Sequence, residues 1–175
     1  MKDSRKQVVT LVQIALYAAL FVVLDFVSNS IPFFKMPQGG TLGLSVIVLL
    51  LASYHLGWKA GLAVVAITIP LQFIAAPPLT QHLGDFFLEY VLAFLVYGMA
   101  SVFPNYGKNG WFMLGIYVTN ILRFLIHLVA GVYFWGATWW GSLLYNGWYM
   151  VPTLIVCAAV LPLLLPRIQK VSERA

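Results

Sequence analysis

Long apolar runs separated by short polar segments dominate this chain. The runs are continuous and do not alternate between apolar and polar positions, which favours helices over the strands of a membrane barrel. A helix needs roughly 20 apolar residues to cross a bilayer. The pattern predicts an all-α integral membrane protein with six transmembrane helices in a single domain, 1–175. The approximate spans are 8–28, 42–54, 60–76, 86–103, 111–134 and 143–165.

The fifth predicted helix carries functional groups at four-residue steps: Arg123, His127, Gly131 and Trp135. At 3.6 residues per turn each step drifts by only about 40°, so the four residues share one stripe. A guanidinium in a bilayer-spanning helix must face protein or a cavity rather than lipid. The stripe therefore predicts a polar surface inside the protein.

The preceding predicted helix supplies acidic residues, Asp85 and Glu89, beside Tyr90. Two interpretations follow from this pairing. Two helices with complementary polar stripes can enclose a pocket for a polar ligand. Alternatively, Arg123 and one acid form only a buried ion pair that fixes helix register. Ionisable residues inside a membrane are functional candidates by default, which favours the pocket.

Composition agrees with a membrane setting, because 62% of the 175 residues are hydrophobic and only 9% are charged, against about 25% charged in soluble domains. Cys157 is the single cysteine, so no disulfide can form within the chain. The sequence has no P-loop, no nucleophile motif and no paired histidines at metal-ligand spacing. We therefore expect no ATP site, metal, cofactor or enzymatic activity in this chain.

The placement of lysine and arginine predicts the orientation of the helices. With six crossings and the N-terminus inside, eight of these residues lie in inside segments, and the outside loops hold only Lys35. Both termini are therefore expected to be cytoplasmic. The formal charge of +5 favours contact with anionic membrane lipid. No basic patch interleaved with aromatic residues suggests nucleic acid.

The polar and aromatic residues gather near the outer ends of the predicted helices. The first outside loop, 33–41, contains a proline and two adjacent glycines that can bend over a cavity. The third, 135–141, contains Trp139 and Trp140, although tryptophans also cluster at membrane interfaces without binding anything. Asp25, near the outer end of the first span, is interpreted as an interfacial or pairing residue. A cavity built from these ends would open to the outside.

Four motifs occur in a characteristic order: Met36-Pro-Gln-Gly-Gly40, Leu88-Glu-Tyr90, His127-x-x-x-Gly131-x-x-x-Trp135 and Tyr145-Asn-x-x-Tyr-Met-Val-Pro152. Together they resemble the thiamine-specific S-component of energy-coupling factor vitamin transporters. The resemblance implies a six-helix subunit in the bacterial cell membrane that binds thiamine from outside. It also implies partners, a transmembrane scaffold and two ATPase subunits, that drive release of the vitamin.

The resemblance implies ligand-binding roles for matching residues: Glu89 as the pocket carboxylate, Tyr90 as its aromatic neighbour, His127 as the imidazole, Gly131 as space for the ligand, Trp135 as the stacking indole, and Asn146, beside Tyr145, as an amide near the carboxylate. Ala15 and Ala19 match the small-residue motif that docks onto the scaffold.

This chain also departs from the family pattern. Gly141 stands where the family has a pocket tyrosine, so Trp139 or Trp140 could fill that space. The first-loop tryptophan of some relatives is missing, which leaves the pocket to be closed by another residue of that loop: Phe33, Phe34 or Met36.

The chemistry of thiamine suits these residues. Its thiazolium is a flat permanent cation that can stack under aromatic rings, and its aminopyrimidine edge can pair with a carboxylate, an amide or an imidazole. Two alternatives stay open. The chain could bind another small nutrient or a thiamine precursor, or it could be a small intramembrane enzyme.

Overall fold

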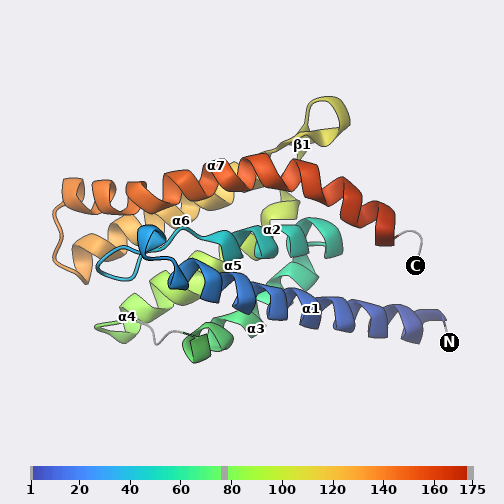
Figure 1. Cartoon of the computed structure of the whole chain (residues 1–175), viewed down its shortest axis with the longest axis horizontal. Coiled ribbons are helices and arrows are strands. Elements are labelled where there is room, and N and C mark those ends of the chain that lie inside the picture. The colour runs from blue at the N-terminus through green and yellow to red at the C-terminus, as the bar shows by residue number, and fades with distance from the viewer. Residues whose placement is uncertain (1, 76–78, 173–175) are drawn as a thin grey trace.

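The computed structural model describes residues 2–75 and 79–172 and is an elongated bundle of helices that run roughly along its long axis (Figure 1). Its main helices are α1 (Lys2–Ser30), α2 (Leu44–Leu56), α3 (Trp58–Ala75), α6 (Leu114–Tyr133) and α7 (Trp139–Ser172). Another helical stretch between α3 and α6 consists of α4 (Leu83–Phe86), the π-helical turn η2 (Phe87–Leu92), α5 (Ala93–Gly98) and the 3-10 turn η3 (Ala100–Val102).

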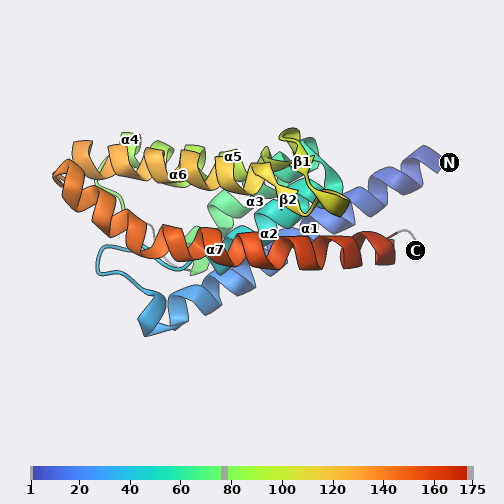
Figure 2. The same ribbon diagram turned by 90° about the horizontal axis from the view of Figure 1, so that it is seen from above.

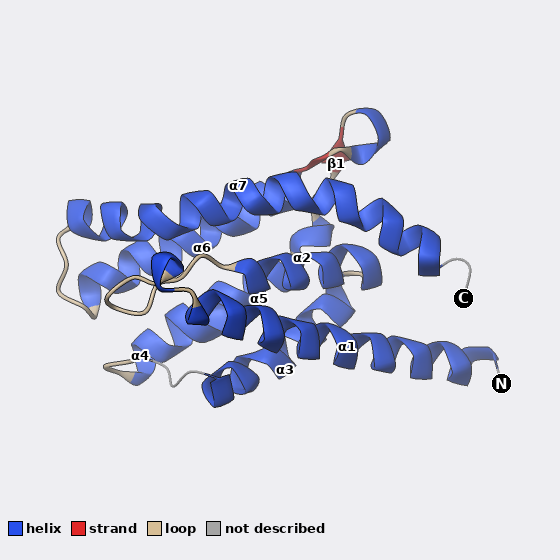
Figure 3. Ribbon diagram, in the orientation of Figure 1, coloured by secondary structure: helices blue, strands red, loops and turns tan. Residues whose placement is uncertain are grey.

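The predicted all-α character is confirmed, since helix dominates Figure 3 and the strands of the described residues are two short ones. These strands, β1 (Asn105–Tyr106) and β2 (Phe112–Met113), form an antiparallel hairpin around the short turn η4 (Lys108–Gly110). Another short turn, η1 (Pro32–Phe34), lies in the loop after α1.

Several predicted helix limits are wrong. The fifth helix begins at Leu114 rather than 111, because Phe112 and Met113 pair with β1. The sixth begins at Trp139 rather than 143 and continues to Ser172 through three prolines. The predicted end of the third span, residue 76, lies outside the described residues.

Within the described residues, four helical stretches are long and apolar enough to cross a membrane: Ser4–Ser30, Leu83–Val102, Leu114–Tyr133 and Trp139–Ser172. The apolar helices α2 and α3 are shorter. A helix that is apolar on all sides belongs in the protein interior. In α2 every residue from Ser45 to Ser53 is buried, and the core around it includes Phe21 of α1, Val64 of α3 and Leu161 of α7.

Two glycines let α2, α3 and α5 approach closely. A Cβ atom on Gly61 would lie 2.7 Å from the carbonyl oxygen of Gly98, and one on Gly98 would lie 2.9 Å from the backbone of Leu62. The hydroxyl of Ser53 donates a hydrogen bond of 2.7 Å to that same Gly98 carbonyl. Small residues at such positions are what allows backbone-to-backbone packing in membrane bundles.

The two ends of the bundle differ in charge. One end contains the start of α1, the α2–α3 junction, the β1–β2 hairpin and the end of α7. Both chain termini lie at this end, as Figure 2 shows. These segments carry most of the basic residues, namely Arg5, Lys6, Lys59, Lys108, Arg167 and Lys170. The opposite end, hereafter the loop end, contains the connections after α1, after α3 and between α6 and α7, with Lys35 as their basic residue among those described.

Candidate ligand-binding site

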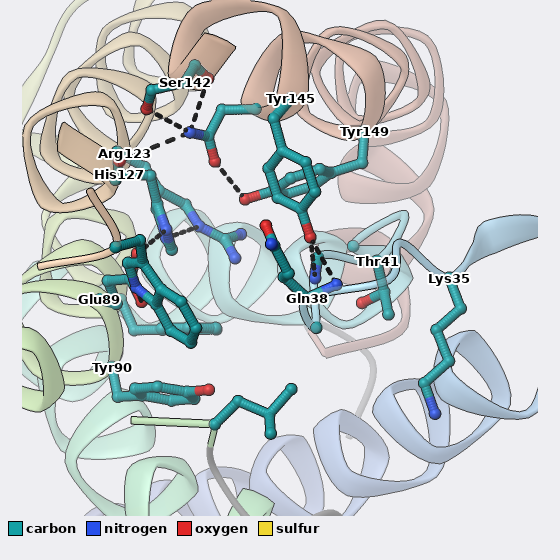
Figure 4. Close-up of a pocket in the computed structure, with 18 of the residues that line it drawn as sticks. Lys35, Gln38, Thr41, Glu89, Tyr90, Arg123, His127, Ser142, Tyr145 and Tyr149 are labelled. Atoms are coloured by element: carbon teal, nitrogen blue, oxygen red, sulfur yellow. Dashed lines mark hydrogen bonds and ion pairs between the residues drawn. The ribbon is translucent and has the colours of Figure 1, made fainter. Parts of the chain in front are cut away.

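A cavity of about 690 Å³ lies at the loop end of the bundle (Figure 4). It is lined by residues of α1, the loop after it, α2, α3, η2, α6, the loop after α6, and α7. A volume of this size is typical of small-molecule sites. All four members of the predicted stripe on α6 and its following loop line the cavity, as do Glu89 and Tyr90.

Glu89 lies at the centre of a cluster that joins three segments of the chain. The indole Nε1 of Trp135 donates to its Oε2 across 3.4 Å, and Nδ1 of His127 lies 3.3 Å from its Oε1. Side-chain exposures of 14% for Glu89 and 11% for His127 show that both are largely withdrawn from solvent. Glu89 belongs to the π-helical turn η2, a rare geometry that is frequent at functional sites.

Arg123 orients the imidazole of His127 from one turn below. Its Nε donates to Nε2 of His127 across 3.4 Å, which makes Nε2 the acceptor and places the imidazole proton on Nδ1, facing Glu89. The alternative interpretation, an ion pair between Arg123 and Asp85 or Glu89, is wrong, since the described residues contain no such pair within 4 Å. The guanidinium instead lies 4.6 Å from the ring centroid of Phe94, where aromatic faces stabilise it.

Asp85 is fully buried and forms a different contact. Its Oδ2 accepts a hydrogen bond of 2.8 Å from the backbone N–H of Gln81, so it anchors the start of α4. Asp85 is not among the residues that line the cavity, whose acidic members are Asp25 and Glu89.

Asn146 joins α6 to α7 at the edge of the cavity. Its Nδ2 donates to the carbonyl of Ser142 across 2.9 Å, and its Oδ1 accepts a hydrogen bond of 2.7 Å from the hydroxyl of Tyr149. Gly131 lines the cavity, but a Cβ there would collide with Oγ of Ser142. The missing side chain therefore lets Ser142 of α7 approach α6, and the predicted role of Gly131 as space for a ligand stays a prediction.

Tyr145 fastens the loop between α1 and α2 onto α7. Its hydroxyl oxygen accepts hydrogen bonds from the backbone N–H groups of Gln38, at 3.1 Å, and Gly40, at 3.4 Å (Figure 4). This section of the loop lines the cavity, whereas Phe33, Phe34 and Met36 do not. The expectation that one of those three side chains closes the pocket is thus not met by the structure.

Trp139 and Trp140 lie outside the cavity lining, and their exposures are 54% and 67%. On α7 the cavity side is taken by Gly141, Ser142, Tyr145 and Asn146. Trp140 falls on the opposite face of the helix, whereas Trp139, seven residues before Asn146, lies at the edge of the cavity side. Their ligand-binding role stays a prediction. Trp139 packs against the ring of Tyr133.

Sequence reasoning missed several cavity residues on the first three helices. Asp25, interpreted as an interfacial or pairing residue, lines the cavity together with three polar residues assigned no role: Asn29, Ser45 and Gln72. A lone carboxylate in a membrane span was a usable signal for Asp25. No group of metal-ligating side chains occurs within the described ranges.

Ala15 and Ala19 are far from this chemistry in sequence and lie on α1. Both are exposed, whereas Ala18 between them is buried at 3% exposure. The exposed face of α1 also includes Leu11, Leu16 and Leu20. The predicted docking strip is therefore accessible at the surface of this chain.

Comparison with known proteins identifies the family of this chain. The profile of a family described as thiamine transporter protein (Thia_YuaJ) matches residues 11–173. This chain belongs to the thiamine transporter protein family. The sequence is 33% identical to thiamine transporter ThiT of Bacillus subtilis (strain 168), over 99% of this chain and 100% of that protein. It is 25% identical to thiamine transporter ThiT of Lacticaseibacillus paracasei, over 93% of this chain and 90% of the relative.

A solved structure supports the fold. ThiT from Listeria monocytogenes superposes with a TM-score of 0.72 at 23% identity, covering 94% of this chain and 97% of that one. The family match confirms the resemblance carried by the sequence motifs. A member of this transporter family is not an enzyme, which rules out the intramembrane-enzyme interpretation.

Proposed function

We propose that this chain is the high-affinity thiamine-binding subunit of an energy-coupling factor transporter, which captures the vitamin from outside the cell. The observation that carries the proposal is Glu89, a largely buried carboxylate held by Trp135 and His127 in the wall of a cavity of small-molecule size. A buried carboxylate is costly unless a cation or hydrogen-bond donors compensate it. A cationic ring beside Glu89 supplies that compensation.

The proposed contacts use the surroundings of Glu89. The thiazolium stacks on the indole of Trp135, a contact of about 0.5–2 kcal/mol, with Tyr90 on a neighbouring part of the wall. The aminopyrimidine pairs with Glu89 and with the second lone pair of Asn146 Oδ1, whose first lone pair is taken by Tyr149. Tyr145 acts through the loop that it holds against the cavity.

Six crossings with both termini cytoplasmic, in the bacterial cell membrane, are part of the same proposal. The basic segments and both termini share one end of the bundle, as the positive-inside rule requires of a cytoplasmic side. The cavity lies at the other end, which then faces the outside. In this arrangement α2 and α3 cross as short, largely enclosed helices.

Uphill uptake requires energised partners, because this sequence contains no P-loop. The proposed partners are a transmembrane scaffold and two ATPase subunits. The exposed small residues Ala15 and Ala19 on α1 give a partner helix a place to approach closely.

Mass spectrometry of the ligand carried through purification tests this function. We expect unchanged thiamine at one molecule per chain, and saturable thiamine binding by calorimetry after the ligand is removed. Competition with the pyrimidine and thiazole precursors separates thiamine from its fragments. Retention of a different nutrient, or failure to bind thiamine at all, would overturn the assignment of the ligand.

A further inference from the structure

A second group of polar side chains lines the cavity, from helices that contribute nothing to the Glu89 cluster. Asp25 of α1, Ser45 of α2 and Gln72 of α3 form what we call the α1–α3 subsite. The hydroxyl of Ser45 donates to Oδ1 of Asp25 across 3.1 Å, and Nδ2 of Asn29 lies 3.3 Å from the other carboxylate oxygen. Asp25 is thus held in place, while each of its oxygens keeps a lone pair for another donor.

Gln72 has a buried donor without an acceptor. The residue is 7% exposed, and within the described part of the chain its Nε2 has no hydrogen-bond partner. Leaving a buried amide unpaired costs free energy, so such groups call for a partner that completes them. Since Gln72 lines the cavity, a ligand group can be that partner.

Arg123 also lines the cavity and adds further donors. Its Nε donates to His127, its flat face rests on Phe94, and Tyr97 lies beside it, which leaves part of its five N–H groups for other acceptors. Figure 4 shows the guanidinium pointing into the cavity among Glu89, Gln38 and Tyr145. The terminal N–H groups are therefore able to donate to a ligand.

The chemistry of this group selects what it binds. A cation beside Asp25 would also face Arg123 and the amide donor of Gln72. An anion beside Gln72 and Arg123 would face the carboxylate of Asp25. A neutral hydroxyl satisfies both sides, because it donates to Asp25 and accepts from Gln72 or Arg123.

We propose that the α1–α3 subsite binds a neutral hydroxyl group of the ligand and selects for it. The proposal rests on the proposed function, in which the ligand is thiamine, a molecule with a hydroxyethyl arm on its thiazolium. The α1–α3 subsite then binds the hydroxyl of this arm, while the Glu89 cluster binds the two rings. Gln72 and Asp25 are its specificity-determining residues.

The test compares three ligands on the purified full chain by calorimetry: thiamine, its analogue with an ethyl arm in place of hydroxyethyl, and its phosphate monoester. In the unmodified protein we expect the ethyl analogue to bind at least about tenfold more weakly than thiamine. In Gln72→Leu this ratio should fall below about threefold. Gln13→Leu, the same substitution on α1 outside the cavity, should keep the full ratio.

Asp25→Asn provides an independent arm of the test. The phosphate ester should bind the unmodified chain more weakly than thiamine does, and Asp25→Asn should narrow that difference by removing the opposing charge. Tighter binding of the ester than of thiamine to the unmodified chain would overturn the neutral-hydroxyl proposal in favour of an anion subsite. An unchanged ethyl-to-hydroxyethyl ratio in folded Gln72→Leu would also overturn it. If neither thiamine nor the ethyl analogue binds the unmodified chain, the proposed function fails instead.

Discussion

At the scale of single residues, Glu89 derives its properties from neighbours on other segments. One carboxylate oxygen accepts a hydrogen bond from the indole of Trp135, and the other lies next to Nδ1 of His127. Arg123 in turn sets the tautomer of His127. This chain of contacts holds the carboxyl group in the cavity wall with one nearby donor on each oxygen. An incoming cation therefore meets an oriented carboxylate and requires little rearrangement of the site.

Replacement of Glu89 by glutamine should weaken thiamine binding by roughly 1.5–3 kcal/mol, because a charge-assisted contact becomes a neutral one. Titration calorimetry in detergent measures the change, and the thermal unfolding midpoint shows whether the variant is folded. Unchanged affinity in a folded Glu89→Gln protein would remove this residue from the site.

Trp135 and Trp140 offer a matched pair of indoles, one in the cavity lining and one outside it. We expect Trp135→Ala to lose affinity for thiamine together with most of the ligand-induced quenching of fluorescence, since it removes the stacking surface. Trp140→Ala should keep both. Equal affinities in the two variants would assign Trp135 to the interfacial belt rather than to the ligand.

At the scale of elements, the site depends on how α6 meets α7. Gly131 allows Ser142 to approach α6, where its hydroxyl donates to the carbonyl of Leu128 across 3.0 Å. Asn146 binds Ser142 one turn further along. A side chain added at Gly131 would therefore disturb Ser142 and, through it, the cavity residue Asn146.

Gly131→Ala should lower stability by about 0.5–1.5 kcal/mol, because the new methyl group displaces the Ser142 hydroxyl from its hydrogen bond to the carbonyl of Leu128. Gly147→Ala is the matched control, since a Cβ there meets nothing within 4 Å. Thermal unfolding in detergent, with and without thiamine, should show a lower midpoint and weaker binding only for Gly131→Ala. A normal midpoint for that variant would contradict the tight contact.

At the scale of the whole molecule, binding and docking occupy separate surfaces. The cavity lies among the loop-end segments, whereas Ala15 and Ala19 are exposed near the middle of α1 and do not line it. A partner can thus engage α1 without touching the ligand. The proposed transporter uses this separation to keep capture and energised release on different faces.

Ala15→Trp or Ala19→Trp should leave thiamine affinity nearly intact while abolishing uptake and co-purification with the scaffold, because a bulky side chain holds the partner helix away. Ala18→Trp is the contrasting variant, since Ala18 is buried and its replacement should destabilise the fold itself. Loss of binding along with uptake in the Ala15 or Ala19 variants would show that the strip packs within the chain.

The features that follow from local periodicity and composition could be predicted from the amino-acid order. Apolar runs gave the helical class, and four-residue spacing placed Arg123, His127, Gly131 and Trp135 on one stripe that does line the cavity. The motif around Glu89 and Tyr90 was likewise enough to place both in the lining. These are properties of a helix and its faces, which depend on neighbours close in the chain.

The contacts between side chains of different helices could be known only from the folded structure. In the folded protein Arg123 stacks on Phe94 instead of pairing with an acid. Trp139 and Trp140 are exposed outside the cavity lining, whereas Asp25 and Gln72 belong to it. Helix rotation and packing angle set these contacts, and both depend on close approaches such as that of Gly131 to Ser142. Such approaches join residues distant in sequence, so no local pattern encodes them.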